Sequence, residues 1–214
     1  MVDLTYLRNA YEKRKLEIKK RLEDFEKIWE KSNKDLFVEL CFCLLTPMSR
    51  ARAADEAINH LLKKNLLSVE NKNQILKELN DAGVRFPENK AKFIIEAREF
   101  FTHNGKIDIK NKLNLGTSNA KREWLVNNVK GLGYKEASHF LRNIGLGFDL
   151  AILDRHIMKN LLKYGIIKEI PKCLTKKCYL SLENKMKEFS EKINIPLAEL
   201  DLLFWSEETG EVFK

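Results

Sequence analysis

The sequence predicts an all-α protein, and three observations support that prediction. Apolar residues recur at the three- and four-residue spacing of helices along most of the 214 residues. No segment shows the apolar–polar alternation of a β-hairpin. The glycines between Gly83 and Gly165 fall between the helical segments, where glycine commonly ends a helix.

The first predicted helix spans residues 4–31 and is long or broken, with Leu7, Tyr11 and Phe25 among its apolar positions. Ser32 and Asn33 then offer a cap for the next helix. That segment, DLFVELCFCLL at 35–45, is apolar on nearly every side and stops before Pro47. It is expected to be a central helix surrounded by others, with a buried strand as the alternative.

Further helices are expected where the helical spacing resumes. They cover residues 50–64, 70–81, 89–102, 117–129, 134–144, 154–164, 178–192 and 196–208.

Composition favours a compact protein of one or two domains, with 44% hydrophobic and 33% charged residues. No apolar run is long enough to span a membrane, and the N-terminus lacks the order of a signal peptide, so a cytosolic protein is expected. The net charge of +8 favours a polyanionic partner such as nucleic acid. Surface ion pairs of a heat-adapted protein are the alternative explanation.

The four cysteines do not form a metal-binding pattern. Cys41 and Cys43 lie in the apolar run and are expected to be buried, whereas Cys173 and Cys178 are candidates for a loop disulfide. Neither His139 nor His156 has a ligand partner at useful spacing. No zinc or iron–sulfur centre is therefore expected.

The stretch VKGLGYKEASHF predicts two helices joined by a tight turn at Gly131 and Gly133. Glycines let the backbone approach a ligand closely, and free N–H groups at a helix start can bind phosphate. Such contacts hold DNA without reading its sequence. An ordinary helix–helix turn is the alternative.

Two residues near this turn are candidates for chemistry. Lys135 would lie in the first turn of the second helix, where the positive helix end favours the neutral, nucleophilic amine. Asp154 precedes another helix and is expected to be its N-cap. The chain between the two residues is long enough to bring Asp154 back to face Lys135.

Gly131, Gly133, Lys135 and Asp154 together resemble the signature of the helix-hairpin-helix superfamily of DNA glycosylases. The C-terminal segment LAELDLLFWSEETGEVFK narrows this resemblance to the archaeal-type 8-oxoguanine DNA glycosylases, the second Ogg family, over nearly the whole chain. This sequence has Lys130 where many superfamily members have proline. The cysteine cluster of the superfamily's iron–sulfur branch is absent.

The resemblance implies a two-lobed fold with an active cleft between the lobes. Residues 33–148 would form the middle domain with the hairpin, and residues 1–32 with 149–214 would form the second lobe. It also implies a bifunctional DNA glycosylase and AP lyase. Lys135 would attack the sugar of 8-oxoguanine and form an imine, Asp154 would stabilise positive charge, and β-elimination would nick the strand.

The resemblance also implies residues that recognise the base. Trp205 offers a flat face to an extruded purine, and the carboxylate of Lys214 can accept the N7–H that distinguishes 8-oxoguanine from guanine. Phe86 is a second stacking candidate, and Asp201 lies one helical turn before Trp205. The alternatives are core packing for Trp205 and Phe86 and a frayed end for Lys214.

The loop TPMSRAR corresponds to the place where the superfamily inserts a wedge into the gap left by the flipped base. Met48 is the apolar candidate for that gap, and Arg50 and Arg52 are candidates for contacts with phosphate or the opposite base. Pro47 and Met48 replace polar residues that are common in the superfamily. Alternatively, these side chains simply occupy a helix start.

The partner implied by the resemblance is double-stranded DNA containing 8-oxoguanine, bound by a monomer near the nucleoid. The chemistry needs no organic cofactor or redox metal, although the hairpin carbonyls are candidate ligands for a monovalent cation. Two alternative functions stay open. One is a glycosylase for another damaged or mispaired base, and the other is a non-catalytic hairpin protein that only binds DNA.

Overall fold

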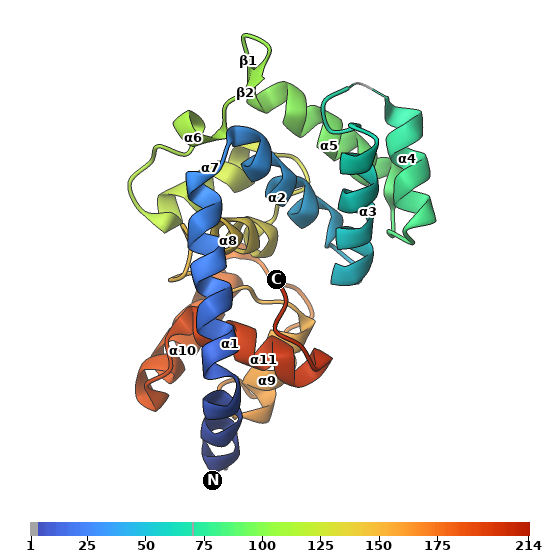
Figure 1. Ribbon diagram of the computed structural model, residues 1–214. Coiled ribbons are helices and arrows are strands. Elements are labelled where there is room, and N and C mark those ends of the chain that lie inside the picture. The colour runs from blue at the N-terminus through green and yellow to red at the C-terminus, as the bar shows by residue number, and fades with distance from the viewer. Residues whose placement is uncertain (1–3, 70) are drawn as a thin grey trace.

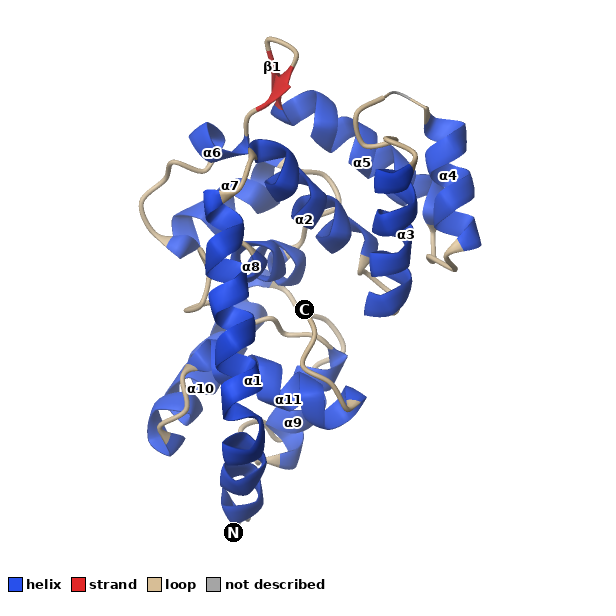
Figure 2. Ribbon diagram, viewed as in Figure 1, coloured by secondary structure: helices blue, strands red, loops and turns tan. Residues whose placement is uncertain are grey.

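A computed structural model describes residues 4–69 and 71–214 of the protein. These residues form helices and one short antiparallel ribbon (Figures 1 and 2). The helices are α1 (Leu4–Glu30), α2 (Asn33–Leu45), α3 (Ala51–Lys63), α4 (Lys72–Asp81), α5 (Pro87–Phe101), α6 (Ile109–Lys112), α7 (Ser118–Asn128), α8 (Tyr134–Asn143), α9 (Arg155–Lys163), α10 (Lys176–Ile193) and α11 (Leu197–Thr209). The strands are β1 (Thr102–His103) and β2 (Lys106–Ile107). The predicted all-α class is confirmed.

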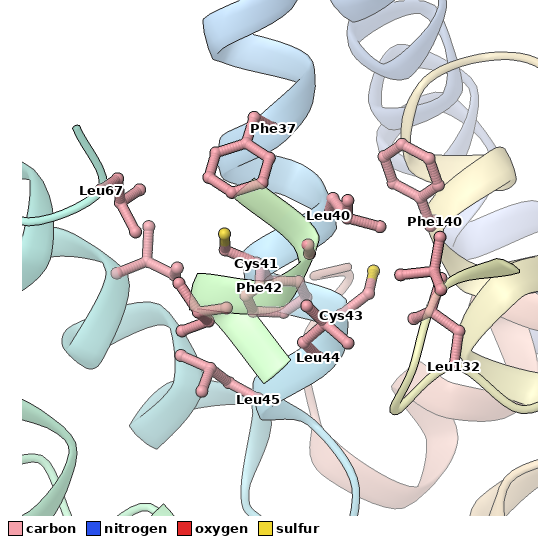
Figure 3. Packing of buried hydrophobic residues seen from close by; sticks show 14 of the residues in the cluster. Phe37, Leu40, Cys41, Phe42, Cys43, Leu44, Leu45, Leu67, Leu132 and Phe140 are labelled. Carbon is pink, nitrogen blue, oxygen red and sulfur yellow. The ribbon is translucent and has the colours of Figure 1, made fainter. Parts of the chain in front are cut away.

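Helix α2 is the central helix of its region, and the alternative of a buried strand is wrong. Ser32 is its N-cap and accepts a hydrogen bond from the backbone N–H of Asp35, which confirms the predicted cap. The helix packs against α3, α5 and α8. Figure 3 shows buried side chains of α2 together with Leu67, Leu132 and Phe140 from the segments around it. An all-round apolar surface suits a helix with neighbours on several sides.

The buried apolar residues fall into two clusters. The first runs from Leu36 to Leu150 and centres on α2. The second combines residues of α1, such as Leu7 and Ile18, with residues from Ala151 to Phe204. Helix α1 extends alongside both groups of helices in Figure 1. These clusters support the proposed division into a middle domain, 33–148, and a lobe built from both ends of the chain.

The ribbon of β1 and β2 was not expected from the sequence. Its strands have two residues each, which is too short for alternation to be visible. Asn104 and Gly105 both have positive φ angles in the turn between them. An Asn–Gly pair is typical of such tight hairpins, and it was the available signal.

Several helix ends differ from the expected bounds for local reasons. Helix α5 begins at Pro87, two residues early, because proline suits the first helical position. Helix α10 begins at Lys176 because the side chain of Thr175 accepts a hydrogen bond from the backbone N–H of Cys178. The four-residue α6 was too short to be recognised by its spacing.

All four cysteines are free, so the alternative of a loop disulfide between Cys173 and Cys178 is wrong. Cys41 and Cys43 are buried, as predicted. Across residues 4–69 and 71–214, no helix is both long and apolar enough to cross a membrane.

Candidate active site

The turn between α7 and α8 depends on a glycine at its first position. Gly131 has a φ angle of +89°, and a Cβ atom there would lie 2.6 Å from Cδ2 of Phe93 on α5. Both facts favour glycine, because a side chain would be strained and would collide with α5. Gly133 then caps α8, and its N–H donates to Oε2 of Glu136 at 3.2 Å.

Lys135 lies in the first turn of α8, as predicted. Its side chain is 24% exposed, and its Nζ lies 2.8 Å from Oε1 of Glu136. His139 and Arg142 follow at the four- and seven-residue spacing that places side chains on one helix face. Burial, together with the charges of Arg142 and Lys135, lowers the pKa of His139 well below its ordinary value. Its surroundings therefore favour the neutral form of the His139 imidazole.

Asp154 is the N-cap of α9, as predicted. Its Oδ1 accepts hydrogen bonds from the backbone N–H groups of His156 and Ile157, each at 2.8 Å. Its Oδ2 has no hydrogen-bond partner among the residues that the structure describes. One carboxylate oxygen thus holds the start of the helix, and the other keeps its capacity to accept a hydrogen bond.

The segment before Asp154 is held by buried polar groups. The hydroxyl of Tyr179 donates to the carbonyl of Ala151 at 2.6 Å and accepts from the N–H of Leu153 at 3.3 Å. Oε2 of Glu183 accepts from the N–H of Ala151 at 2.8 Å, and the same carboxylate pairs with the buried Arg122. These bonds fix the backbone that presents Asp154.

Asp201 is buried rather than exposed beside Trp205. Its Oδ2 lies 3.7 Å from a guanidinium nitrogen of Arg142, which joins α11 to α8. Burial, with a smaller contribution from the negative charge of Asp154, raises the pKa of Asp201 to about 7, although the nearby Arg142 acts in the opposite direction. The structure therefore places Asp201 close to the catalytic candidates, and its contact with an extruded base stays a prediction.

Trp205 is partly exposed, and it lies between α9 and the C-terminal tail, residues 210–214. Its ring centroid is 6.5 Å from that of His156 and 6.2 Å from that of Phe213. The indole therefore lies beside the first turn of α9, the helix that Asp154 caps. Simple core packing of Trp205 is wrong.

The C-terminal residue is anchored, so the alternative of a frayed end is wrong. The Nζ of Lys214 lies 3.2 Å from Oε1 of Glu39 and 3.6 Å from Oδ1 of Asp55. It also lies 4.3 Å from the ring centroid of Phe42, in a cation–π contact. In Figure 1 the C-terminus lies between the two groups of helices.

The remaining predicted residues lie on the surface near the hairpin or the tail. Met48 and Phe86 are 68% and 60% exposed, so the alternative of a core aromatic is wrong for Phe86. Arg50 is exposed at the start of α3. Arg52 pairs with Glu211, and its guanidinium lies 4.0 Å from the ring centroid of Phe213.

Sequence reasoning missed Lys90. This residue is only 4% exposed, and burial lowers its pKa to about 8. It lies on the buried stripe of α5 with Ile94, Ala97 and Phe101, at helical spacing. A lysine within an apolar stripe was the available signal, because such a residue is almost never buried without partners.

Within 4–69 and 71–214, no group of three or more His, Cys, Asp or Glu side chains is arranged to hold a metal ion.

Comparison with known proteins identifies relatives along almost the whole chain. A family model described as 8-oxoguanine DNA glycosylase matches residues 18–195. A Fusobacterium nucleatum protein named 8-oxoguanine DNA glycosylase/AP lyase is 46% identical over 210 residues, which cover 97% of this chain and 96% of the relative. A Methanocaldococcus jannaschii protein of the same name is 39% identical over 197 residues, which cover 92% of this chain and 91% of the relative.

Two solved structures share this fold. The crystal structure of the 8-oxoguanine DNA glycosylase of Thermotoga maritima has a TM-score of 0.87 and 36% identity, and the match covers 99% of this chain and 98% of that one. The crystal structure of the Methanocaldococcus jannaschii 8-oxoguanine glycosylase/lyase in complex with a 15mer DNA containing 8-oxoguanine has the same TM-score and identity. That match covers 98% of this chain and 100% of the other.

Proposed function

The chain belongs to the 8-oxoguanine DNA glycosylase family, and on that basis we propose that it excises 8-oxoguanine from double-stranded DNA and then nicks the strand. One observation carries the mechanism. Lys135 follows the hairpin in the first turn of α8, and Asp154 caps α9 with one carboxylate oxygen unpaired among the described residues. A nucleophile and a fixed negative charge are the two groups that the reaction needs.

The first step is extrusion of the lesion from the helix. Unstacking a base costs a few kcal/mol, which contacts in the pocket offset. Gly131 and Gly133 would bring the backbone close to a phosphate, and Arg50 and Arg52 would add positive charge. Met48 would fill the gap that the base leaves.

Base recognition would use the surfaces around Trp205. The indole stacks on the extruded purine, and the carboxylate of Lys214 accepts the N7–H of 8-oxoguanine. Guanine has an acceptor at that position, so it leaves the carboxylate without a donor. Phe86 is the second stacking candidate, and buried Asp201 would act through Arg142 and Asp154.

The chemical step would be displacement at the sugar. The neutral amine of Lys135 attacks C1′, and the bond from C1′ to the base breaks with its electron pair going to the base. The unpaired oxygen of Asp154 stabilises the positive charge that develops on the sugar. Ring opening then gives a protonated imine between Nζ and C1′.

Strand nicking would follow from this imine. The iminium withdraws electrons from C2′, so a proton leaves C2′ and the 3′ phosphate departs by β-elimination. No organic cofactor or redox metal takes part, and the hairpin carbonyls remain candidate ligands for a monovalent cation. We also propose that the protein acts as a monomer in the cytoplasm, near the nucleoid, where its substrate lies.

The alternative functions are less well supported. The names of the relatives include both glycosylase and lyase activities, which argues against a protein that only binds DNA. Their shared substrate, 8-oxoguanine, argues against a glycosylase specific for another base.

Trapping of the imine tests this proposal. Borohydride added during reaction with an 8-oxoguanine duplex should reduce the imine to a stable protein–DNA adduct. Lys135→Gln should abolish the adduct while binding of the duplex is largely kept. Lys27→Gln, at a 67% exposed side chain on α1, serves as the control and should form the adduct normally. An undiminished adduct in Lys135→Gln would remove Lys135 from this role.

A further inference from the structure

The turn between α2 and α3 is held by a buried ammonium group from another helix. Nζ of Lys90 donates to the carbonyl of Leu45 at 2.8 Å, to the carbonyl of Pro47 at 2.7 Å and to Oγ of Ser49 at 2.9 Å. The carbonyl of Leu45 belongs to the C-terminal end of α2, where a cation is favourable. All three N–H bonds of Lys90 are therefore used on the turn that carries Met48.

The same contacts reach a second turn. Oγ of Ser49 also accepts the backbone N–H of Arg85 at 2.9 Å, and Arg85 directly precedes Phe86. Ser49 and Lys90 thus connect the turn before α3 to the turn before α5. Met48 and Phe86 are held at a fixed relative position by this connection.

Both connected turns have unusual backbone conformations. Met48 has a φ angle of +58° and Phe86 one of +55°, in the left-handed region that non-glycine residues rarely adopt. Such a conformation persists only where the surrounding structure enforces it. Both side chains nevertheless point into solvent, so apolar burial does not hold them.

The two side chains flank one hollow next to the hairpin. It has a volume of about 200 Å³, and Met48, Phe86 and Gly131 contribute to its lining. An apolar pair beside a phosphate-binding turn suits the faces of unpaired nucleobases, which stack on apolar and aromatic groups.

We infer that Lys90 is a positioning residue, which holds the turns of Met48 and Phe86 as one preorganised apolar pair that contacts the unpaired bases of the opened duplex. This inference rests on the proposed function. Lys90 does not act as a nucleophile, because its three N–H bonds are held by acceptors. A methionine would fill the same space as Lys90, but it would remove the three hydrogen bonds that tie α5 to the turn before α3.

Lys90→Met tests this role. Ser49→Ala is a second variant, which removes the acceptor shared by Lys90 and the backbone N–H of Arg85 but keeps the bonds of Lys90 to the carbonyls of Leu45 and Pro47. The control is Lys92→Met, at a 59% exposed side chain on the same helix. Excision from an 8-oxoguanine duplex should fall about tenfold in Lys90→Met, as expected when hydrogen bonds that hold a side chain are lost. Nicking of a single-stranded abasic oligonucleotide, which has no base to extrude, should stay within roughly twofold.

A double-mutant cycle distinguishes positioning from general support of the fold. Met48→Ala with Phe86→Ala should lower duplex excision by itself, and adding Lys90→Met should cause little further loss. Full additivity would overturn the inference, as would equal losses on the two substrates or no loss in either Lys90→Met or Ser49→Ala. Borohydride trapping of Lys90→Met on the single-stranded abasic substrate should be retained, which would show that the chemistry of Lys135 is intact. Failure of this inference can therefore be told apart from failure of the proposed function.

Discussion

At the scale of single residues, the two carboxylate oxygens of Asp154 have different surroundings. Oδ1 accepts two backbone N–H groups at the start of α9, and Oδ2 is unpaired among the described residues. A capping role and a catalytic role are therefore compatible in one side chain. They differ in what they require, because a cap needs only an acceptor oxygen whereas the transition state needs a negative charge.

Asp154→Asn separates these two roles. Asparagine keeps a capping oxygen, so the free energy of unfolding should change by less than about 1 kcal/mol. Loss of the negative charge should slow base release by about two to three orders of magnitude. Urea unfolding and single-turnover excision measure the two effects. A parallel fall in stability and rate would leave only the capping role.

Asp201 predicts a pH dependence of stability. Its pKa is raised from 3.8 to about 7 in the folded protein, first by burial and then by Asp154. At a pH between these two pKa values, Asp201 has lost its proton in the unfolded chain but still holds it in the folded protein. The free energy of unfolding should therefore fall as pH rises from about 4 to about 7.

Asp201→Asn cannot ionise and should lack this dependence. Urea unfolding of both proteins at several pH values should show the wild type losing stability relative to the variant across that range, with little further change above it. Parallel curves for the two proteins would mean that Asp201 ionises normally in the fold, paired with Arg142.

At the scale of elements, the hairpin is positioned by its packing on α5. The φ angle of Gly131 and the closeness of Phe93 both exclude a side chain at this position. Gly116 makes an informative contrast, because a Cβ atom there would meet nothing within 4 Å. The turn is therefore set by a tertiary contact as well as by its own sequence.

Gly131→Ala should destabilise the protein by about 2–4 kcal/mol, from the left-handed strain and the overlap with Phe93. Gly116→Ala should change stability by less than about 0.5 kcal/mol. Thermal and urea unfolding measure both. Phe93→Ala removes the ring that the new Cβ atom would overlap. The double variant should therefore be less destabilised than the sum of the two single variants, and simple additivity would contradict the clash.

At the scale of the whole molecule, the C-terminal tail connects the two clusters. Val212 packs against the second cluster and Phe213 against the first. Nε of Arg21, on α1, donates to the carbonyl of Phe213 at 2.8 Å. The ammonium of Lys214 is held by Glu39 at 3.2 Å. The tail thereby places the terminal carboxylate at the junction of the two groups of helices.

Removal of Lys214 tests base recognition by this carboxylate. The truncated protein, residues 1–213, should excise 8-oxoguanine roughly tenfold more slowly or worse, because the carboxylate moves back by up to about 3.6 Å and leaves N7–H unpaired. Nicking of a pre-formed abasic site should be much less affected, since no base is recognised.

Lys214→Met is the matched variant, because it keeps the terminal carboxylate and removes only the ammonium anchor. Its rate of 8-oxoguanine excision should lie between the rates of the full-length and truncated proteins. If the truncated protein lost activity equally on the lesion and abasic substrates, the cause would be general misfolding. If it lost no activity on either substrate, the tail would play no part in recognition.

Some features of this protein follow from its sequence alone. The helices, the cap at Ser32, the hairpin at Gly131 and the positions of Lys135 and Asp154 depend on residues within a few positions of each other. Local spacing, capping and turn chemistry act over that range, so the sequence shows them directly.

Other features were decided only by the tertiary structure. Lys90 finds its carbonyl partner 45 residues away at Leu45, and Lys214 finds Glu39 at a separation of 175 residues. The apolar stripe of α5 indicates that Lys90 is buried, but no local pattern identifies the groups that bind Lys90 or Lys214. The free energy of a buried charge depends on which partners surround it, and those partners are brought together only when the helices pack.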